Sequence, residues 1–177
     1  MIPLGSNLPT FSLIDTASQK IINVPGEDPY EATLIMFICN HCPFVVHIRQ
    51  ELIKIAKDYT GKGLRMIAIS SNDIDNYPED SPQKMAELAK KEGFLFPYLY
   101  DESQDVAKMF SAACTPDFFL YDSKLKLVYR GQLDDSRPGN GLPVTGKDLR
   151  TAINATISGG QVNPKQHPSI GCNIKWK

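Results

Sequence analysis

Two cysteines separated by two residues, Cys39 and Cys42, are the side chains of this sequence best suited to chemistry. A pair with this spacing can form and break a disulfide, and the thiolate is the attacking species. The pair follows the continuous apolar run TLIMFI (33–38) and precedes a helical pattern. Free backbone N–H groups and the macrodipole at a helix N-terminus stabilise a negative sulfur. The position therefore predicts an activated thiol.

The order of the residues predicts a role for each thiol. We expect Cys39 to lie at the helix N-cap, more exposed than Cys42, and to attack a disulfide. Cys42, one turn later, would attack the mixed disulfide and release the reduced product. His41, if protonated, would stabilise the Cys39 thiolate and make the disulfide more oxidising. The alternative for His41 is a solvent-exposed spacer.

The elements around the pair show a β/α alternation. The apolar run before the pair is typical of a strand buried on both faces. Pro43 suits the first turn of the helix that follows, and Gly61 and Gly63 end it. The apolar side chains of this helix fall on one face: Phe44, Ile48, Leu52, Ile55 and Tyr59.

The remaining pattern predicts an α/β fold with a central mixed β-sheet flanked by helices. We expect further strands at 11–14, 21–24, 64–69, 97–100, 118–121 and 127–131. We expect helices from Ser81 to Gly93, over 105–111, and after a cap at Thr145. Residues 1–177 then form one domain, with an N-terminal extension and β-hairpin at 1–32 and an irregular tail at 158–177.

Composition excludes several classes of protein. The chain of 177 residues is 42% hydrophobic with a formal net charge of −1 and no clustered basic face, so no nucleic-acid partner is expected. It has no apolar run long enough for a membrane span, so no membrane partner is expected. Residues 1–10 lack the features of a signal peptide, which favours a cytoplasmic location. Four cysteines are too few for a disulfide scaffold, and no cofactor is implied.

Several segments carry a resemblance to a known family. They are the buried strand, CNHCP and amphipathic helix, the Thr115-Pro116 pair, the stretch FPYLYDESQDVAKMFSAACTPDFFLYDSKLKLVYRGQLDD (96–135) and the ending GCNIKWK. Together they resemble the thioredoxin superfamily, in its peroxiredoxin-like (alkyl hydroperoxide reductase/thiol-specific antioxidant-like) branch with a thioredoxin-type Cys-X-X-Cys. The resemblance covers roughly residues 3–177 and implies a thioredoxin-like fold.

The resemblance also implies a substrate-binding edge. Pro116 would be a cis-proline that faces the cysteine pair, although most X-Pro bonds are trans. Thr115 would offer its backbone to an extended substrate, as in strand addition. Pro43 joins these two residues in the expected substrate-binding set.

This sequence departs from the thioredoxin pattern at one position. Thioredoxins carry a buried acid six residues before the first cysteine, and that place is Thr33 here. The proton acceptor for Cys42 is therefore open between His41, Glu31 and a water molecule.

A second departure concerns peroxide chemistry. Peroxiredoxins place their peroxidatic cysteine where Cys42 falls, with a proline seven residues before it and a threonine or serine three before it. Those places hold Ile35 and Cys39, which weakens a peroxidase interpretation.

Each of the other two cysteines has a redox and a structural interpretation. Cys114, near Pro116, is either a third redox thiol or a small buried side chain, and burial is the commoner state of a free cysteine. Cys172 in the tail is either a resolving thiol that folds back or a packed free thiol. Because no second chelating pair exists, we expect no metal site.

Four further polar residues are expected on the surface. His47 lies off the apolar face of the first helix, and His167 stands in the tail. Asp134 and Asp135 are typical of a solvated turn, with a place at the active face as the alternative. Trp176, the only tryptophan, is expected to anchor the tail by packing.

The sequence therefore favours a thiol–disulfide oxidoreductase that acts through Cys39 and Cys42 on protein or small-molecule disulfides, with a thiol reductant or oxidant as electron partner. A peroxiredoxin-like thiol peroxidase with an antioxidant role is the first alternative. A non-enzymatic metal- or partner-binding module on the same fold is the second. Asn40 and His41 favour an oxidising pair, whereas the expected compartment favours reduction, so the direction stays open.

Overall fold

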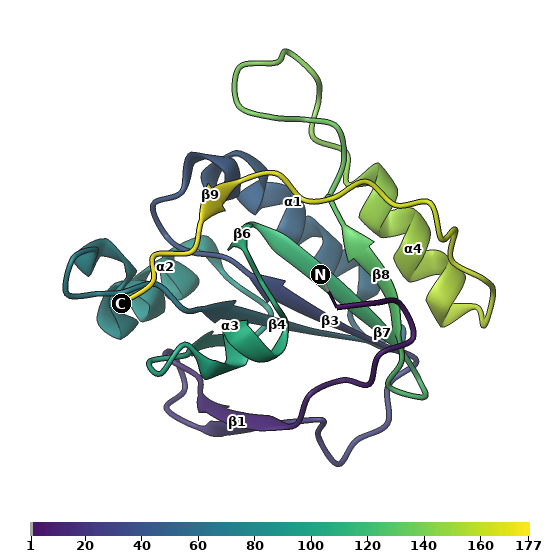
Figure 1. Cartoon of the computed structure of the whole chain (residues 1–177), viewed down its shortest axis with the longest axis horizontal. Helices are drawn as coiled ribbons and strands as arrows, with labels where there is room; N and C mark the ends of the chain where they lie inside the picture. Colours follow the sequence, from purple (N-terminus) through teal and green to yellow (C-terminus); the bar gives the residue numbers. More distant parts are fainter. Residues whose placement is uncertain (1) are drawn as a thin grey trace.

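A computed structural model describes residues 2–177. Its centre is a five-stranded sheet in the order β5-β4-β3-β7-β8 (Figure 1). Strands β3 (Ala32–Phe37), β4 (Leu64–Ser70) and β5 (Tyr98–Tyr100) run parallel, whereas β7 (Asp117–Asp122) and β8 (Leu127–Gly131) add an antiparallel hairpin. The predicted mixed sheet is therefore confirmed.

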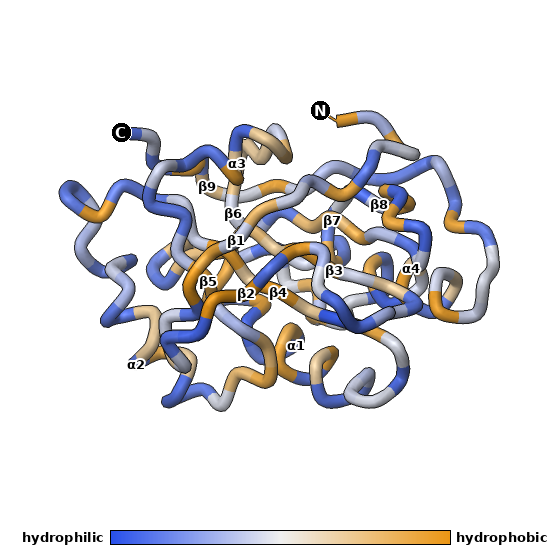
Figure 2. The backbone as a smooth tube through the Cα atoms, turned by 90° about the horizontal axis from the view of Figure 1, so that it is seen from below, coloured by the Kyte–Doolittle hydropathy of each residue, from blue (hydrophilic) through white to orange (hydrophobic). Residues whose placement is uncertain are grey.

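Helices cover both faces of this sheet. The first core lies under α1 (Pro43–Tyr59), α2 (Pro82–Glu92) and α4 (Lys147–Ile157), and the second lies under α3 (Asp105–Met109). Figure 2 shows the strands between α1, α2 and α4 on one side and α3 on the other. The predicted hairpin of β1 (Phe11–Ile14) and β2 (Ile21–Val24) is present, and its apolar side chains pack in the second core.

Strand β3 explains why its sequence is continuously apolar. Leu34 and Met36 enter the first core, and Ile35 and Phe37 enter the second. All six of its residues are buried. Successive side chains of a strand point to opposite faces, so a central strand in a three-layer fold needs apolar residues at every position.

Two predicted features of the fold are wrong in detail. Helix α4 has Gly146, with φ of 67°, at its N-cap, where Thr145 was expected. The tail from 158 contains a short strand, β9 (Cys172–Asn173), which pairs antiparallel with β6 (Cys114–Thr115). A two-residue strand carries no periodic pattern, which explains why the sequence predicts only an irregular tail.

Candidate active site

The cysteine pair lies in the turn between β3 and α1, at one end of the sheet. The backbone of β3 continues pairing as far as Ile38, whose N–H bonds the carbonyl of Ile69. Helix α1 begins at Pro43, so its N-cap is Cys42 and not Cys39. The Cys42 carbonyl accepts hydrogen bonds from Val45 at 3.0 Å and Val46 at 2.9 Å. The thiol at the helix terminus is therefore the second of the pair, and this corrects the sequence prediction.

Both thiols are buried. Cys39 is 2% exposed and Cys42 is 0% exposed, so Cys39 is the more exposed thiol, as expected, but only by this small margin. The sulfur of Cys39 lies 3.5 Å from the Thr115 hydroxyl, and the Cys42 thiol can donate to the Thr115 carbonyl at 3.2 Å. The Thr115–Pro116 peptide bond is cis, as the resemblance implies. A single residue before the cis-proline thus contacts both thiols.

The two thiols share one proton unequally. The neighbouring Cys39 thiol, the Cys172 thiol and the Val45 amide together lower the pKa of Cys42 to about 4, and Cys39 has the largest effect. These neighbours outweigh burial, which by itself raises the pKa of Cys42. The neighbouring Cys42 sulfur, burial and the charge of Asp80 raise the pKa of Cys39. At rest the negative charge therefore lies on Cys42.

The buried acid of the site is Asp80, which the sequence interpretation missed. It ends a 3₁₀ turn (Pro78–Asp80) and is completely buried. Its Oδ1 accepts the Asn40 N–H at 2.7 Å, and its Oδ2 accepts Asn72 at 2.8 Å and His41 Nδ1 at 2.7 Å. The conformation of the cysteine turn is thus fixed by a carboxylate from another segment.

His41 turns toward Asp80, and its side chain stays about one-third exposed. Its ring stacks on Tyr77, with centroids 5.6 Å apart and an interplanar angle of 4°. The nearest ligand atoms of Cys39, His41 and Asp80 lie within 4.8 Å of one another. His41 is therefore held in place beside Cys39 and is not a free spacer. Of the other acceptors considered, Glu31 is exposed and its side chain lies beside Gly63.

The other two cysteines lie close to the pair. Cys172 faces Thr115 across the β6–β9 ladder and packs against the first core, which contains both Cys39 and Cys42. Cys114 turns its sulfur toward the carbonyls of Pro116, at 3.6 Å, and Ser169, at 4.0 Å. Burial raises the pKa of Cys114 to about 12. All four cysteines are free thiols, so the site holds more sulfur than the motif alone indicates.

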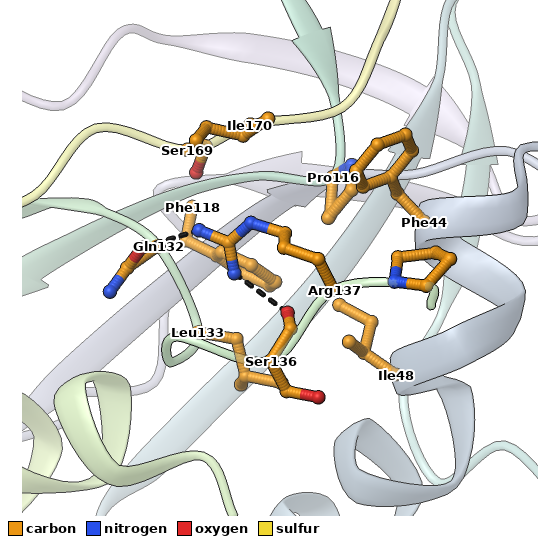
Figure 3. Close-up of a pocket in the computed structure, with 11 residues that line it drawn as sticks. Phe44, Ile48, Pro116, Phe118, Gln132, Leu133, Ser136, Arg137, Ser169 and Ile170 are labelled. Atoms are coloured by element: carbon orange, nitrogen blue, oxygen red, sulfur yellow. Dashed lines mark hydrogen bonds between the residues drawn. The ribbon is translucent and has the colours of Figure 1, made fainter. Parts of the chain in front are cut away.

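A shallow pocket opens beside the cis-proline (Figure 3). Phe44 of α1 and Pro116 form one wall, and Ser169 and Ile170 of the tail form another. The Arg137 side chain extends across it, held by hydrogen bonds to its own loop. The pocket therefore combines apolar walls with a fixed positive charge next to the predicted substrate edge.

The candidates expected on the surface divide into two groups. His167 and Asp135 are exposed. Asp134 is buried, and its Oδ2 accepts the backbone N–H groups of Thr145 and Gly146 at 2.7 Å, so it fixes the start of α4 rather than a solvated turn.

Two other side chains also depart from expectation. His47 is half-buried and its Nε2 lies 2.8 Å from the Ser136 hydroxyl. Trp176 is 44% exposed, whereas Ile174 is 3% exposed and enters the second core. The tail is therefore anchored by Ile174 and not by the tryptophan. Within residues 2–177, no helix combines the length and apolarity needed to cross a membrane.

The sheet order, the Cys-X-X-Cys turn and the facing cis-proline define a thioredoxin-like fold. Residues 4–130 match the model of the AhpC/TSA family, and the chain belongs to that family. Membership indicates thiol-based redox chemistry, either thiol–disulfide exchange or thiol peroxidase activity. A search of curated proteins finds no match.

Solved structures agree with this placement. An uncharacterized conserved protein from Geobacillus kaustophilus is 54% identical, with a TM-score of 0.97 over 100% of this chain and 94% of that chain. A hypothetical protein from Sinorhizobium meliloti is 50% identical, with a TM-score of 0.97 over 100% and 96%. A thioredoxin-family thiol:disulfide interchange protein from Chlorobium tepidum is 13% identical, with a TM-score of 0.67 over 89% and 99%, and shares the fold.

Proposed function

We propose that the protein is a thiol–disulfide oxidoreductase that works through Cys39 and Cys42 on protein or small-molecule disulfides. The observation that carries the proposal is the pair of buried thiols at the start of α1, both in contact with the residue before the Thr115–Pro116 cis bond. Helix-terminal thiolates with this spacing suit exchange chemistry. A cytoplasmic location and a thiol reductant or oxidant as electron partner belong to the same proposal.

Cys39 is the attacking thiol of this proposal, and because the resting charge lies on Cys42, the attack requires transfer of the Cys39 proton. As the Cys39 sulfur bonds to one sulfur of the substrate, its proton passes to Cys42, which then donates to the Thr115 carbonyl at 3.2 Å. The second substrate sulfur leaves as a thiolate and takes up a proton. Cys42 loses its proton and attacks Cys39, which releases the reduced substrate. The substrate gains two electrons and two protons, and the pair becomes a disulfide.

The roles of the neighbouring residues follow from their contacts. Asp80 holds His41 and the Asn40 N–H, so it fixes the turn that carries Cys39. Thr115 contacts both thiols while its backbone pairs with β9, and Pro116 and Pro43 shape the substrate edge. His41 is the titratable group that faces solvent and Cys39 together, which suits proton exchange with water.

A thiol peroxidase is the second candidate. It is favoured by family membership and by the lowered pKa of Cys42, which occupies the place of the peroxidatic cysteine. Against it, Cys42 is 0% exposed, and Ile35 and Cys39 replace the proline and hydroxyl residue expected around it. Peroxide consumption no faster than that of free cysteine removes this candidate.

A metal-binding module receives less support. Cys39, His41 and Asp80 could supply three ligands, but both Asp80 oxygens already accept hydrogen bonds. These donors use three of the about four acceptor sites of a carboxylate, so a metal ion would compete with them. Stoichiometric zinc in untagged protein would favour the metal-binding module over the oxidoreductase.

The test is a redox titration in glutathione buffers, read by thiol alkylation and peptide mass. We expect a reversible two-electron couple between Cys39 and Cys42. In Cys39→Ser, turnover of a model disulfide should fall by at least about 100-fold, because the attacking sulfur is gone. Full activity in Cys39→Ser, or no couple between these residues, contradicts the proposal.

A further inference from the structure

The backbone of the C-terminal tail is in direct contact with the active-site strand β6. Strand β9 pairs Cys172 with Thr115 and Asn173 with Cys114. A Cβ placed on Gly171 would lie 2.0 Å from the Thr115 carbonyl oxygen and 3.1 Å from the Pro116 ring. Since only glycine tolerates that approach, the sequence at this point is fitted to the cis-proline edge.

Polar and apolar contacts hold this segment in register. The backbone N–H of Lys175 donates to the Asn72 side chain at 2.9 Å, and its carbonyl accepts from Asp73 N–H at 2.8 Å and from Gln104 Nε2 at 2.9 Å. Ile174 fills the second core directly after the strand. The tail is therefore anchored beyond Cys172, and the thiol is presented by a fixed backbone.

The fixed backbone brings Cys172 to Cys42. The Cys42 sulfur lies 3.2 Å from the carbonyl of Thr115, the residue directly opposite Cys172 in the ladder. Burial and the neighbouring Cys42 sulfur raise the pKa of Cys172 to about 11. Cys42 thus has two thiol neighbours, Cys39 on its own turn and Cys172 on the tail.

We propose that Cys172 is a third redox thiol of this site. It replaces Cys39 as the disulfide partner of Cys42, so that the Cys39–Cys42 bond is exchanged for an internal Cys42–Cys172 bond. The inference deepens the proposed function and rests on it. In the exchange, the Cys172 sulfur loses its proton and bonds to Cys42, the Cys39–Cys42 bond breaks, and Cys39 leaves and takes up a proton. The total number of thiols and disulfides is unchanged, so the step needs no external oxidant.

The exchange has a consequence for substrate access. Strand β9 occupies the edge of β6 where an extended protein substrate would pair with Thr115. The tail is therefore an internal substrate that presents its own cysteine to the pair. A Cys42–Cys172 bond would lock this strand in place and leave Cys39 as a free thiol.

Cys114 supplies the matched control. It neighbours Cys172 on the same ladder, but its sulfur points to the carbonyls of Pro116 and Ser169. If closeness to the active site were sufficient, both Cys114 and Cys172 would form a disulfide with Cys42. The direction of the two side chains predicts this bond for Cys172 alone.

The test uses Cys39→Ser, equilibrated with excess oxidised glutathione, quenched with acid and mapped by peptide mass. We expect the loss of two free thiols per chain and an internal Cys42–Cys172 disulfide without bound glutathione. Cys39→Ser/Cys114→Ser should behave in the same way, and Cys39→Ser/Cys172→Ser should form no internal bond. Glutathione on Cys42 with Cys172 free, or no reaction at either thiol, overturns the inference.

A second variant separates this inference from the proposed function. Gly171→Ala places a methyl group against the Thr115 carbonyl and should displace β9. On a Cys39→Ser background it should lose the Cys42–Cys172 bond, and on the wild-type background it should keep the Cys39–Cys42 couple. If Cys172→Ser keeps that couple but Cys39→Ser forms no Cys42–Cys172 bond, only the third-thiol role fails. If Cys172→Ser shows no Cys39–Cys42 couple, the proposed function fails.

Discussion

At the residue scale, the charge of the cysteine pair has a measurable signature. The pKa of Cys42 is lowered to about 4 by thiol and amide donors, so the thiolate persists in acid. We expect the thiolate absorbance of the reduced protein to stay constant from pH 8 to about pH 5 and to disappear through about pH 4. Alkylation of the pair should follow the same curve.

Single substitutions provide the control for this titration. Cys42→Ser should lose the acid-stable thiolate, because Cys39 alone is buried beside the negative Asp80. Cys114→Ser should retain it, since Cys114 does not donate to the pair. A wild-type midpoint near the ordinary cysteine value of about 8.5 would contradict this account of the site. The midpoint belongs to the pair, since the two groups titrate together.

Asp80 can be tested through stability as well as reactivity. In Asp80→Asn the amide nitrogen faces either the Asn40 N–H or the Asn72 and His41 donors, which leaves donors opposed in a buried site. We expect a loss of about 1–3 kcal/mol in the free energy of unfolding, measured in urea. Loss of the Asp80 charge should also lower the pKa of Cys39.

The neighbouring Glu79 gives the matched control. Its side chain is exposed, so Glu79→Gln should stay within about 0.5 kcal/mol of wild type. Equal effects of the two substitutions would mean that Asp80 does not organise the turn.

Residue spacing could predict the cysteine pair but not its surroundings. Cys39 and Cys42 are adjacent in sequence to the strand and helix that position them. Asp80 comes from a 3₁₀ turn that is distant in sequence from the pair. An acid between Glu79 and Ser81 is typical of an exposed helix start, so the local sequence does not indicate a buried site residue. The N-cap residue of α1 could have been predicted correctly, because Pro43 at the first helical position makes Cys42 the cap.

At the scale of elements, the tail depends on one apolar anchor. Ile174 is 3% exposed in the second core, and its removal would leave a cavity next to the strand that carries Cys172. We expect Ile174→Ala to reduce the free energy of unfolding by about 2–5 kcal/mol, measured in urea. Hydrogen exchange at residues 171–175 should increase with it.

The same substitution at an exposed position of the tail tests this interpretation. Ile170 is 58% exposed, so Ile170→Ala should change stability by no more than about 0.5 kcal/mol. A loss at Ile174→Ala as small as that at Ile170→Ala would show that the tail is held by its backbone hydrogen bonds alone.

The elements that were predictable are those with long patterns. The buried run of β3 and the apolar face of α1 extend over many residues, so their burial appears in the sequence. Strand β9 exists because Gly171 fits against Thr115 and because Asn72 and Gln104 bind Lys175. Each of these is a contact between distant residues, and none has a local pattern.

At the scale of the whole molecule, the redox state and the folding free energy are linked. Folding lowers the pKa of Cys42, so the folded reduced protein stabilises a thiolate that the unfolded chain does not hold at neutral pH. This contribution is present above the unfolded pKa and is lost as pH falls through about 4. A thiolate stabilised only in the reduced fold makes the disulfide a stronger oxidant.

We therefore expect the reduced protein to unfold at a higher temperature than the protein with a Cys39–Cys42 disulfide at pH 7. A difference of about 1 kcal/mol corresponds to about 2–4 °C in a chain of this size. The reduction potential should accordingly lie nearer to about −120 mV than to −270 mV. The measurement is calorimetry of both forms in a Cys172→Ser background, so that only one disulfide can form. Cys39→Ser/Cys42→Ser should show no dependence on redox buffer. An oxidised form that is the more stable one would place the pair among reductants and show that the Cys42 thiolate does not govern its chemistry.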